Sequence, residues 1–306
     1  MNQKAIADEE ILNKCAERAQ KEIKHYTGKD VDLPLIKKAL PLFEPLLQRL
    51  SSPPIPMVGG LIQYAEKDLE SAELLFEKRL YPPSIFHLQQ AIEKLAKAFA
   101  LSLGLVEEKE LYGKGGIGHI SPRSFILILR EKGAMDLVYL VYQVWGKGKR
   151  YEEMRKSVED FEKLLQKKKE LARLSKEGIL HLIKKKDGII DVLSKIDVRE
   201  FRSRIEKIRI GIKARDRYEG PPLGEGILWH ELGKKETIEE ILRKLMTFVD
   251  LYILTIITFP HSSFSRYPLK GGEVIRYEEG LGIVDCAETL LSITKKTLEE
   301  VKAQLV

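Results

Sequence analysis

One group of polar residues in this chain could bind a phosphate between two helices. Gln90, Glu93 and Lys97 recur three and four residues apart, so a helix would place them on one flank. With Asp68 from the preceding segment, they form a candidate nucleotide- or phosphate-binding cleft. The same residues could instead form an inter-helix hydrogen-bond network, in which an ion pair between Glu93 and Lys97 fixes the helix register or a dimer contact.

A second candidate site combines a histidine and an arginine near the C-terminal end. His261 precedes Arg266 with four residues between them, and Tyr267 follows directly. A histidine can act as a general acid or base, and an arginine can hold a phosphate, so His261 and Arg266 are candidate catalytic residues. Arg266 and Tyr267 are also candidates for nucleotide binding. The alternative is a capped helix end, with Arg266 bonded to carbonyl groups or to an acid.

The third candidate is a basic segment in the middle of the chain. Residues 149–217 hold 22 Lys and Arg against 13 Asp and Glu, a net charge of +9, whereas the whole 306-residue chain has +6. A basic helical arm is typical of proteins that bind phosphate backbones. A contact with a partner protein, or a solvated helix flank, would have the same composition. The expected RNA contacts lie at its end: Arg199, Arg202, Arg204, Lys207, Arg209, Lys213, Arg215 and Arg217.

Helices must position these groups, and the apolar spacing predicts them. A helix is expected after Gly59-Gly60, from Leu61 to about Leu80, and a second begins at the Tyr81-Pro82-Pro83 turn, because proline suits the first turn of a helix. Together they form an antiparallel hairpin. Helical periodicity also covers 146–217, with an expected interruption near 186–188, and resumes over 237–259. The sequence therefore predicts an all-α protein.

The two hairpin segments resemble the HEPN family of α-helical domains, which often occur beside nucleotidyltransferases. The resemblance rests on Tyr64-Ala-Glu-Lys-Asp-Leu69 and on Phe86-His-Leu-Gln-Gln-Ala-Ile-Glu-Lys-Leu-Ala-Lys-Ala98. Gly118-His119-Ile120 looks like the start of the family's third helix. Ser265-Arg266-Tyr267-Pro268 looks like the Arg-Tyr-Pro of a branch that lacks the nuclease motif.

This resemblance implies an antiparallel bundle of four to five helices that forms a homodimer. We expect the bundle at 59–145 and 236–306, an inserted basic arm at 146–235 and an N-terminal helical extension at 1–58. Ribonucleases of the family carry an arginine and then a histidine, with four to six residues between them. Here that spacing occurs at Arg18 and His25, outside the HEPN-like segments.

Composition excludes several other classes of protein. Cys15 and Cys286 are too few for a disulfide framework or a thiolate zinc site, and no glycine loop has phosphate-binding context, so we expect no metal and no cofactor. The apolar run 248–259 includes Asp250 and is too short to span a membrane, which indicates a buried core helix. We expect a cytoplasmic protein without a signal peptide. Abundant charge with only two asparagines is typical of a thermophilic archaeon.

These observations favour a non-catalytic HEPN-like protein that binds RNA or a nucleotide. A partner nucleotidyltransferase in a toxin–antitoxin or defence system is expected from the resemblance. Two alternatives stay open, a metal-independent HEPN-like ribonuclease and a structural dimer or adaptor that binds a protein partner.

Overall fold

The computed structural model describes four main ranges of the chain and a number of isolated residues. The ranges are 55–112, 167–199, 235–266 and 274–305; the isolated residues are 13, 14, 16, 17, 19–21, 23–25, 28, 30–34, 36, 37, 136, 138, 140, 156 and 163. All regular secondary structure in this described part is α-helical, with no strand, so the expected all-α class is confirmed. The chain divides into two compact units, residues 1–51, 129–153 and 192–245 in one and 52–128, 154–191 and 246–306 in the other.

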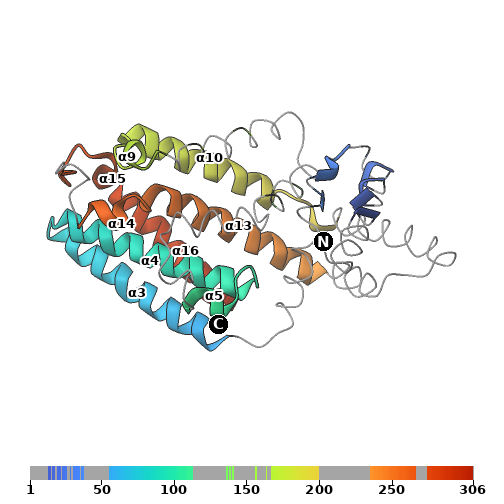
Figure 1. Ribbon diagram of the computed structural model, residues 1–306, viewed down its shortest axis with the longest axis horizontal. Coiled ribbons are helices and arrows are strands. Elements are labelled where there is room, and N and C mark those ends of the chain that lie inside the picture. The colour runs from blue at the N-terminus through green and yellow to red at the C-terminus, as the bar shows by residue number, and fades with distance from the viewer. Residues whose placement is uncertain are drawn as a thin grey trace, which may run out of the picture. The chain divides into compact units, whose positions relative to one another are not determined.

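Helices α3 (Pro56–Glu77) and α4 (Tyr81–Ser102) form the expected antiparallel hairpin in the second unit (Figure 1). Each begins with proline in its first turn, where the missing N–H would have no partner in any case. Arg79 in the turn has a φ of 58°, and the buried Ser84 hydroxyl donates to the Ala72 carbonyl at 2.8 Å. α3 starts five residues before the predicted start at Leu61. It ends three residues earlier than predicted, because the tight turn takes the last three residues of the predicted helix.

Helix α16 (Ala287–Leu305) packs against both members of the hairpin. Its buried face repeats at helical spacing and includes Leu290, Leu298 and Val301. Ion pairs flank this apolar seam: Lys295 lies 3.2 Å from Glu73, and Lys302 contacts Glu66 of α3. Helices α3, α4 and α16 therefore pack together around one apolar core.

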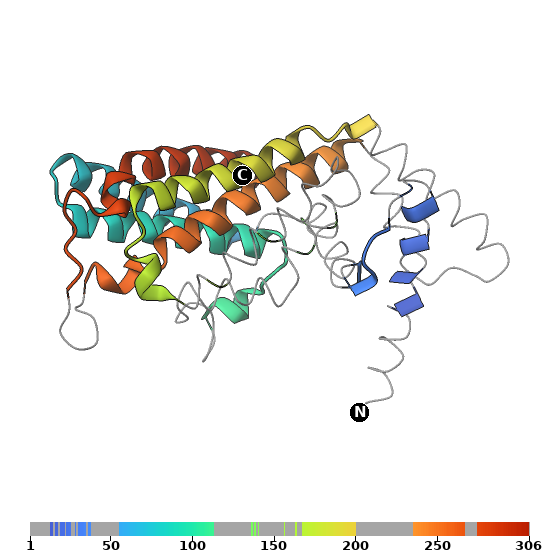
Figure 2. The same ribbon diagram turned by 90° about the horizontal axis from the view of Figure 1, so that it is seen from above.

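Helices α10 (Lys176–Ser194) and α13 (Lys235–Thr258) run side by side where both lie in the second unit (Figures 1 and 2). A buried ion pair joins them: Lys186 Nζ lies 2.5 Å from Asp250 Oδ1, and these side chains are 5% and 12% exposed. The predicted interruption near 186–188 is wrong, because α10 runs through it without a break. Residues 176–191, expected in an inserted arm, lie in the same compact unit as α3 and α4.

Four short helices complete the described elements: α5 (Glu108–Tyr112), α9 (Lys168–Leu171), α14 (His261–Phe264) and α15 (Gly282–Asp285). The backbone between α9 and α10 passes very close to α15. A Cβ on Gly282 would lie 2.1 Å from the Leu174 carbonyl oxygen and 2.6 Å from the Ser175 carbonyl carbon. This position therefore admits glycine alone without a backbone shift.

The apolar run 248–259 is buried, as predicted; residues 248–258 belong to α13, and Phe259 follows its end. Across the described residues, we find no helix with the length and apolarity needed to cross a bilayer.

Candidate functional site

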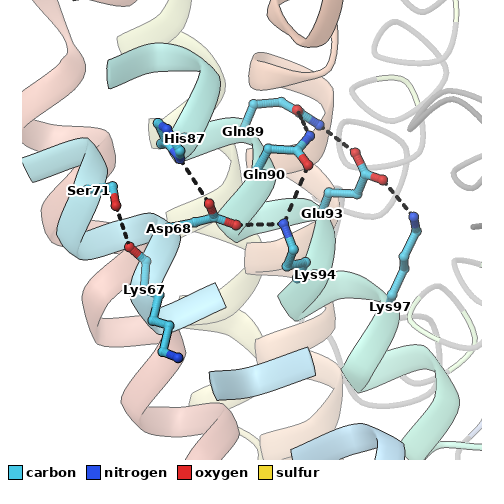
Figure 3. A network of polar contacts seen from close by, with 9 residues as sticks. All are labelled: Lys67, Asp68, Ser71, His87, Gln89, Gln90, Glu93, Lys94 and Lys97. Atoms are coloured by element: carbon cyan, nitrogen blue, oxygen red, sulfur yellow. Dashed lines mark hydrogen bonds and ion pairs between the residues drawn. The ribbon is translucent and has the colours of Figure 1, made fainter. Parts of the chain in front are cut away.

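Asp68 of α3 receives two side chains from α4 (Figure 3). His87 Nδ1 lies 2.9 Å from its Oδ1, and Lys94 Nζ donates to its Oδ2 at 2.6 Å. His87 and Lys94 are seven residues apart, two helical turns, so they lie on the same face of α4. Asp68 is 18% exposed, which makes its two charge-assisted contacts stronger than those of a surface pair. One carboxylate thus fixes the register between the two helices.

The network continues along α4 through four further side chains (Figure 3). Lys94 Nζ lies 3.4 Å from Gln90 Oε1, Gln90 donates to Gln89 at 2.7 Å, and Gln89 donates to Glu93 at 2.8 Å. Lys97 closes the chain with a 2.6 Å bond to Glu93, which is the predicted pair four residues apart. Asp68, Gln90, Glu93 and Lys97 are therefore brought together as the sequence suggested.

Burial determines what this network can do. The side chains of Lys97 and Glu93 are 10% and 14% exposed, and Gln89 is 1% exposed, so these groups mainly satisfy one another. His87 and Lys94 are more open, with side chains 32% and 26% exposed. A ligand could reach the network at this open end, where the His87 imidazole and the Lys94 ammonium group both contact the Asp68 carboxylate.

The open end of the network adjoins a cation–π contact. The guanidinium carbon of Arg266 lies 4.5 Å from the centroid of the Phe86 ring. The Phe86 ring in turn meets the His87 ring edge-on, with centroids 5.4 Å apart. Arg266 also donates from Nη2 to the Ser262 carbonyl at 2.9 Å, the carbonyl contact considered in the alternative interpretation. Arg266 is exposed, while Phe86 and His87 are half-buried. The second candidate site thus touches the first through Phe86.

His261 lies in a different environment from Arg266. It is 1% exposed, and its Nδ1 lies 2.7 Å from the hydroxyl of Tyr277. Burial, together with the charge of Lys168, lowers the pKa of His261 from 6.5 to about 3, and burial raises the pKa of Tyr277. At neutral pH the imidazole is therefore an uncharged, enclosed group that holds the segment around Tyr277 against α14.

Several predicted site residues cannot be placed. Tyr267 and, with one exception, the eight arm residues lie outside the described residues, as do His119 and Arg18. The exception is Arg199, which is exposed and whose backbone N–H donates to Asp197 at 2.8 Å. In the described ranges, no three His, Cys, Asp or Glu side chains gather in a way that could hold a metal ion.

Sequence reasoning did not assign His87, Lys94 or Phe86 to a site. The spacing of His87 and Lys94 offered a signal, because two turns of helix align them with the assigned Gln90. Nothing in the sequence pairs Phe86 with Arg266, 180 residues away, and this contact depends on how α14 packs against α4.

The helices and the network define the class of protein: an all-α bundle in which a helical hairpin carries a half-buried polar chain along its second helix. Residues 58–111 match the model of the HEPN domain family, which confirms the resemblance of the two hairpin segments. The match ends at Leu111, and the Arg-Tyr-Pro branch stays a prediction.

The chain is also similar to a protein of Methanocaldococcus jannaschii named "Putative toxin MJ1304". The two are 42% identical over 45 residues, which cover 15% of this chain and 30% of that relative. The chain thus aligns with less than a third of the relative's length. No solved structure has a significant match to the chain.

Proposed function

We propose that this HEPN-domain protein binds RNA or a nucleotide through the surface formed by Arg266, Phe86 and His87 and the adjoining Asp68–Lys94 pair. The contact between Arg266 and the Phe86 ring carries the proposal. A planar guanidinium held over an aromatic ring is a platform on which a base can stack, and an arginine can hold a phosphate. His87 and Lys94 add donors beside it.

The non-catalytic form of the proposal is supported by the state of His261. A histidine that is 1% exposed and bonded to Tyr277 has no path to a ribose hydroxyl, and its lowered pKa makes it a weak base at neutral pH. Arg266 faces Phe86 and the Ser262 carbonyl. We therefore place ribonuclease activity second.

The name of the M. jannaschii relative supports a toxin–antitoxin setting for this chain. In that setting we propose a cytoplasmic homodimer that acts with a separate nucleotidyltransferase. Copurification of the full chain with the product of a neighbouring nucleotidyltransferase gene would support this assignment, and a chain that stays monomeric and uncaptured would contradict it.

Binding can be measured by fluorescence anisotropy with labelled AMP and with a labelled single-stranded RNA. Arg266→Ala should weaken both by about tenfold or more, since stacking contributes about 1–3 kcal/mol per base. Arg266→Lys keeps the charge and loses the planar stack, so it should recover part of the RNA affinity and little of the AMP affinity. Lys296→Ala is the matched control, because its side chain is 80% exposed on α16 and its loss changes the net charge equally.

Two results would refute the proposal. One is an absence of binding to either probe, or RNA binding that does not depend on salt. The other is an equal loss in Arg266→Ala and Lys296→Ala, which would mean that charge alone governs the interaction.

A further inference from the structure

A second group of cations lies on α9 and the first turn of α10. Residues 167–177 contain five Lys and Arg and two Glu, a net charge of +3 over eleven residues. Lys167, Lys169, Arg173 and Lys176 are exposed. We call these four residues the α9 cluster; it lies within the basic segment 149–217 but apart from the RNA contacts predicted at its end, from Arg199 to Arg217.

The backbone that carries the α9 cluster is held at three points. The Lys168 ammonium points inward, donates to the Ser263 hydroxyl at 2.8 Å and lies 4.9 Å from the centroid of the Phe264 ring. Leu171 and Ala172 are each 2% exposed. Leu174 and Ser175 pass beneath Gly282 in close backbone contact. Because this segment is ordered in advance, a ligand would not have to supply the free energy of ordering it.

The anchor of Lys168 also places the α9 cluster next to the Arg266 surface. Ser263 and Phe264, which Lys168 contacts, belong to α14, and the backbone N–H of Arg266 donates to the Ser263 carbonyl at 3.0 Å. Arg266 then reaches Phe86 and, through it, His87. A continuous series of contacts therefore connects Lys168 of α9, through α14 and Arg266, to His87 of α4, all within the second compact unit.

We infer that the α9 cluster binds the phosphate backbone of a single-stranded RNA whose base stacks at Arg266 and Phe86. This inference rests on the proposed function and extends it from one nucleotide to a chain of them. A basic track beside an aromatic platform matches the chemistry of single strands, whose phosphates need cations and whose unpaired bases need a flat partner. In a duplex the bases are already stacked on one another.

The experiment uses the full chain with three probes. They are AMP, a single-stranded RNA of roughly 12 nucleotides, a length within the range of single-strand sites, and a duplex of the same RNA for comparison. The test variant combines Lys167→Ala, Lys169→Ala and Arg173→Ala and keeps the anchoring Lys168. It should lose about tenfold or more in RNA affinity at low salt. Its slope of log affinity against log salt should fall by about 2, since each phosphate contact on a single strand contributes about 0.7. AMP, which has one phosphate, should bind as before.

The matched control removes three exposed cations elsewhere: Lys109→Ala, Lys295→Ala and Lys296→Ala, with side chains 80%, 63% and 80% exposed. It should change the slope far less than the α9 variant does. Thermal unfolding followed by circular dichroism verifies that both triple variants fold.

The results separate the two proposals. If Arg266→Ala weakens both probes while the α9 variant binds RNA like the parent chain, the inference about α9 is wrong and the proposed function stands. If Arg266→Ala changes neither probe, the proposed function fails. Equal losses in the two triple variants, or a duplex that binds as tightly as the single strand, would also overturn the inference.

Discussion

Acidification should destabilise the protein through His261, and the structure fixes the sign of the effect. In the unfolded chain this histidine takes up a proton below its ordinary pKa of 6.5, whereas burial and Lys168 keep the native ring neutral until about pH 3. Between these values the unfolded state binds one proton more than the native state. Stability should therefore be unaffected by His261 above pH 6.5 and should fall as the pH drops from 6.5 toward 3.

The magnitude follows from the width of this window. One proton of difference changes the free energy of unfolding by about 1.4 kcal/mol per pH unit, so lowering the pH from 6 to 4 should cost about 3 kcal/mol. Urea unfolding followed by circular dichroism at several pH values measures this slope. Below about pH 5, protonation of carboxylates also changes the free energy of unfolding. The effect of His261 is therefore measured as the difference in pH dependence between the parent protein and a variant that lacks this histidine.

His261→Gln supplies that difference, because an uncharged amide can still bond the Tyr277 hydroxyl. This variant should lose stability less steeply by about 1.4 kcal/mol per pH unit between pH 6 and 4. His181→Gln, at an exposed histidine of α10, should follow the parent protein. If parent and His261→Gln show the same slope, or if the ring of His261 titrates near pH 6.5 in a proton NMR spectrum, the reasoning about its burial is refuted. The ribonuclease alternative would then gain support.

Three further substitutions test the packing. Lys186→Met leaves the Asp250 carboxylate buried without its partner and should lower the free energy of unfolding by about 3–5 kcal/mol, while adding Asp250→Leu should restore most of it. Gly282→Ala should cost about 1–3 kcal/mol or more, since the new methyl group meets backbone rather than a movable side chain. Glu93→Ala should cost about 1–3 kcal/mol because the nearly buried Lys97 loses its acceptor. Urea denaturation measures all three.

The substitutions at Lys186 and Gly282 each have a comparison within the chain. Lys167 and Glu170 form an exposed pair, so Lys167→Met should cost under about 1 kcal/mol. A Cβ on Gly59 would meet nothing within 4 Å, so Gly59→Ala should be neutral or stabilising. If the double variant Lys186→Met/Asp250→Leu loses as much free energy of unfolding as the two single variants added together, the buried ion pair is contradicted. If alanine at Gly282 and alanine at Gly59 change the free energy of unfolding equally, the close backbone contact at Gly282 is contradicted.

The hairpin could be predicted because its determinants are local. Successive prolines mark the start of α4, and residues at three- and four-residue spacing form its buried stripe. The pair of Glu93 and Lys97 follows from the same periodicity. Such features need no knowledge of what packs against the helix.

The rest depends on contacts between distant segments. Lys186, Asp187 and Gly188 have the composition of a turn, yet Asp250, 64 residues away, stabilises Lys186 inside a continuous helix. The sequence identified His261 as a possible general acid or base. It could not predict that the ring is buried, because Tyr277 and Lys168 approach His261 only in the folded chain.

The close passage of Gly282 over Leu174 and Ser175 has a consequence for the time course of folding. The contact joins segments more than a hundred residues apart and exists only when both backbones have reached their final positions. Loop closure over such a separation favours late formation, after the local α3–α4 hairpin. Gly282→Ala should therefore accelerate unfolding and leave the folding rate nearly unchanged, a pattern that stopped-flow kinetics would resolve. The absence of a side chain at position 282 would then keep the unfolding rate low and so lengthen the lifetime of the native state.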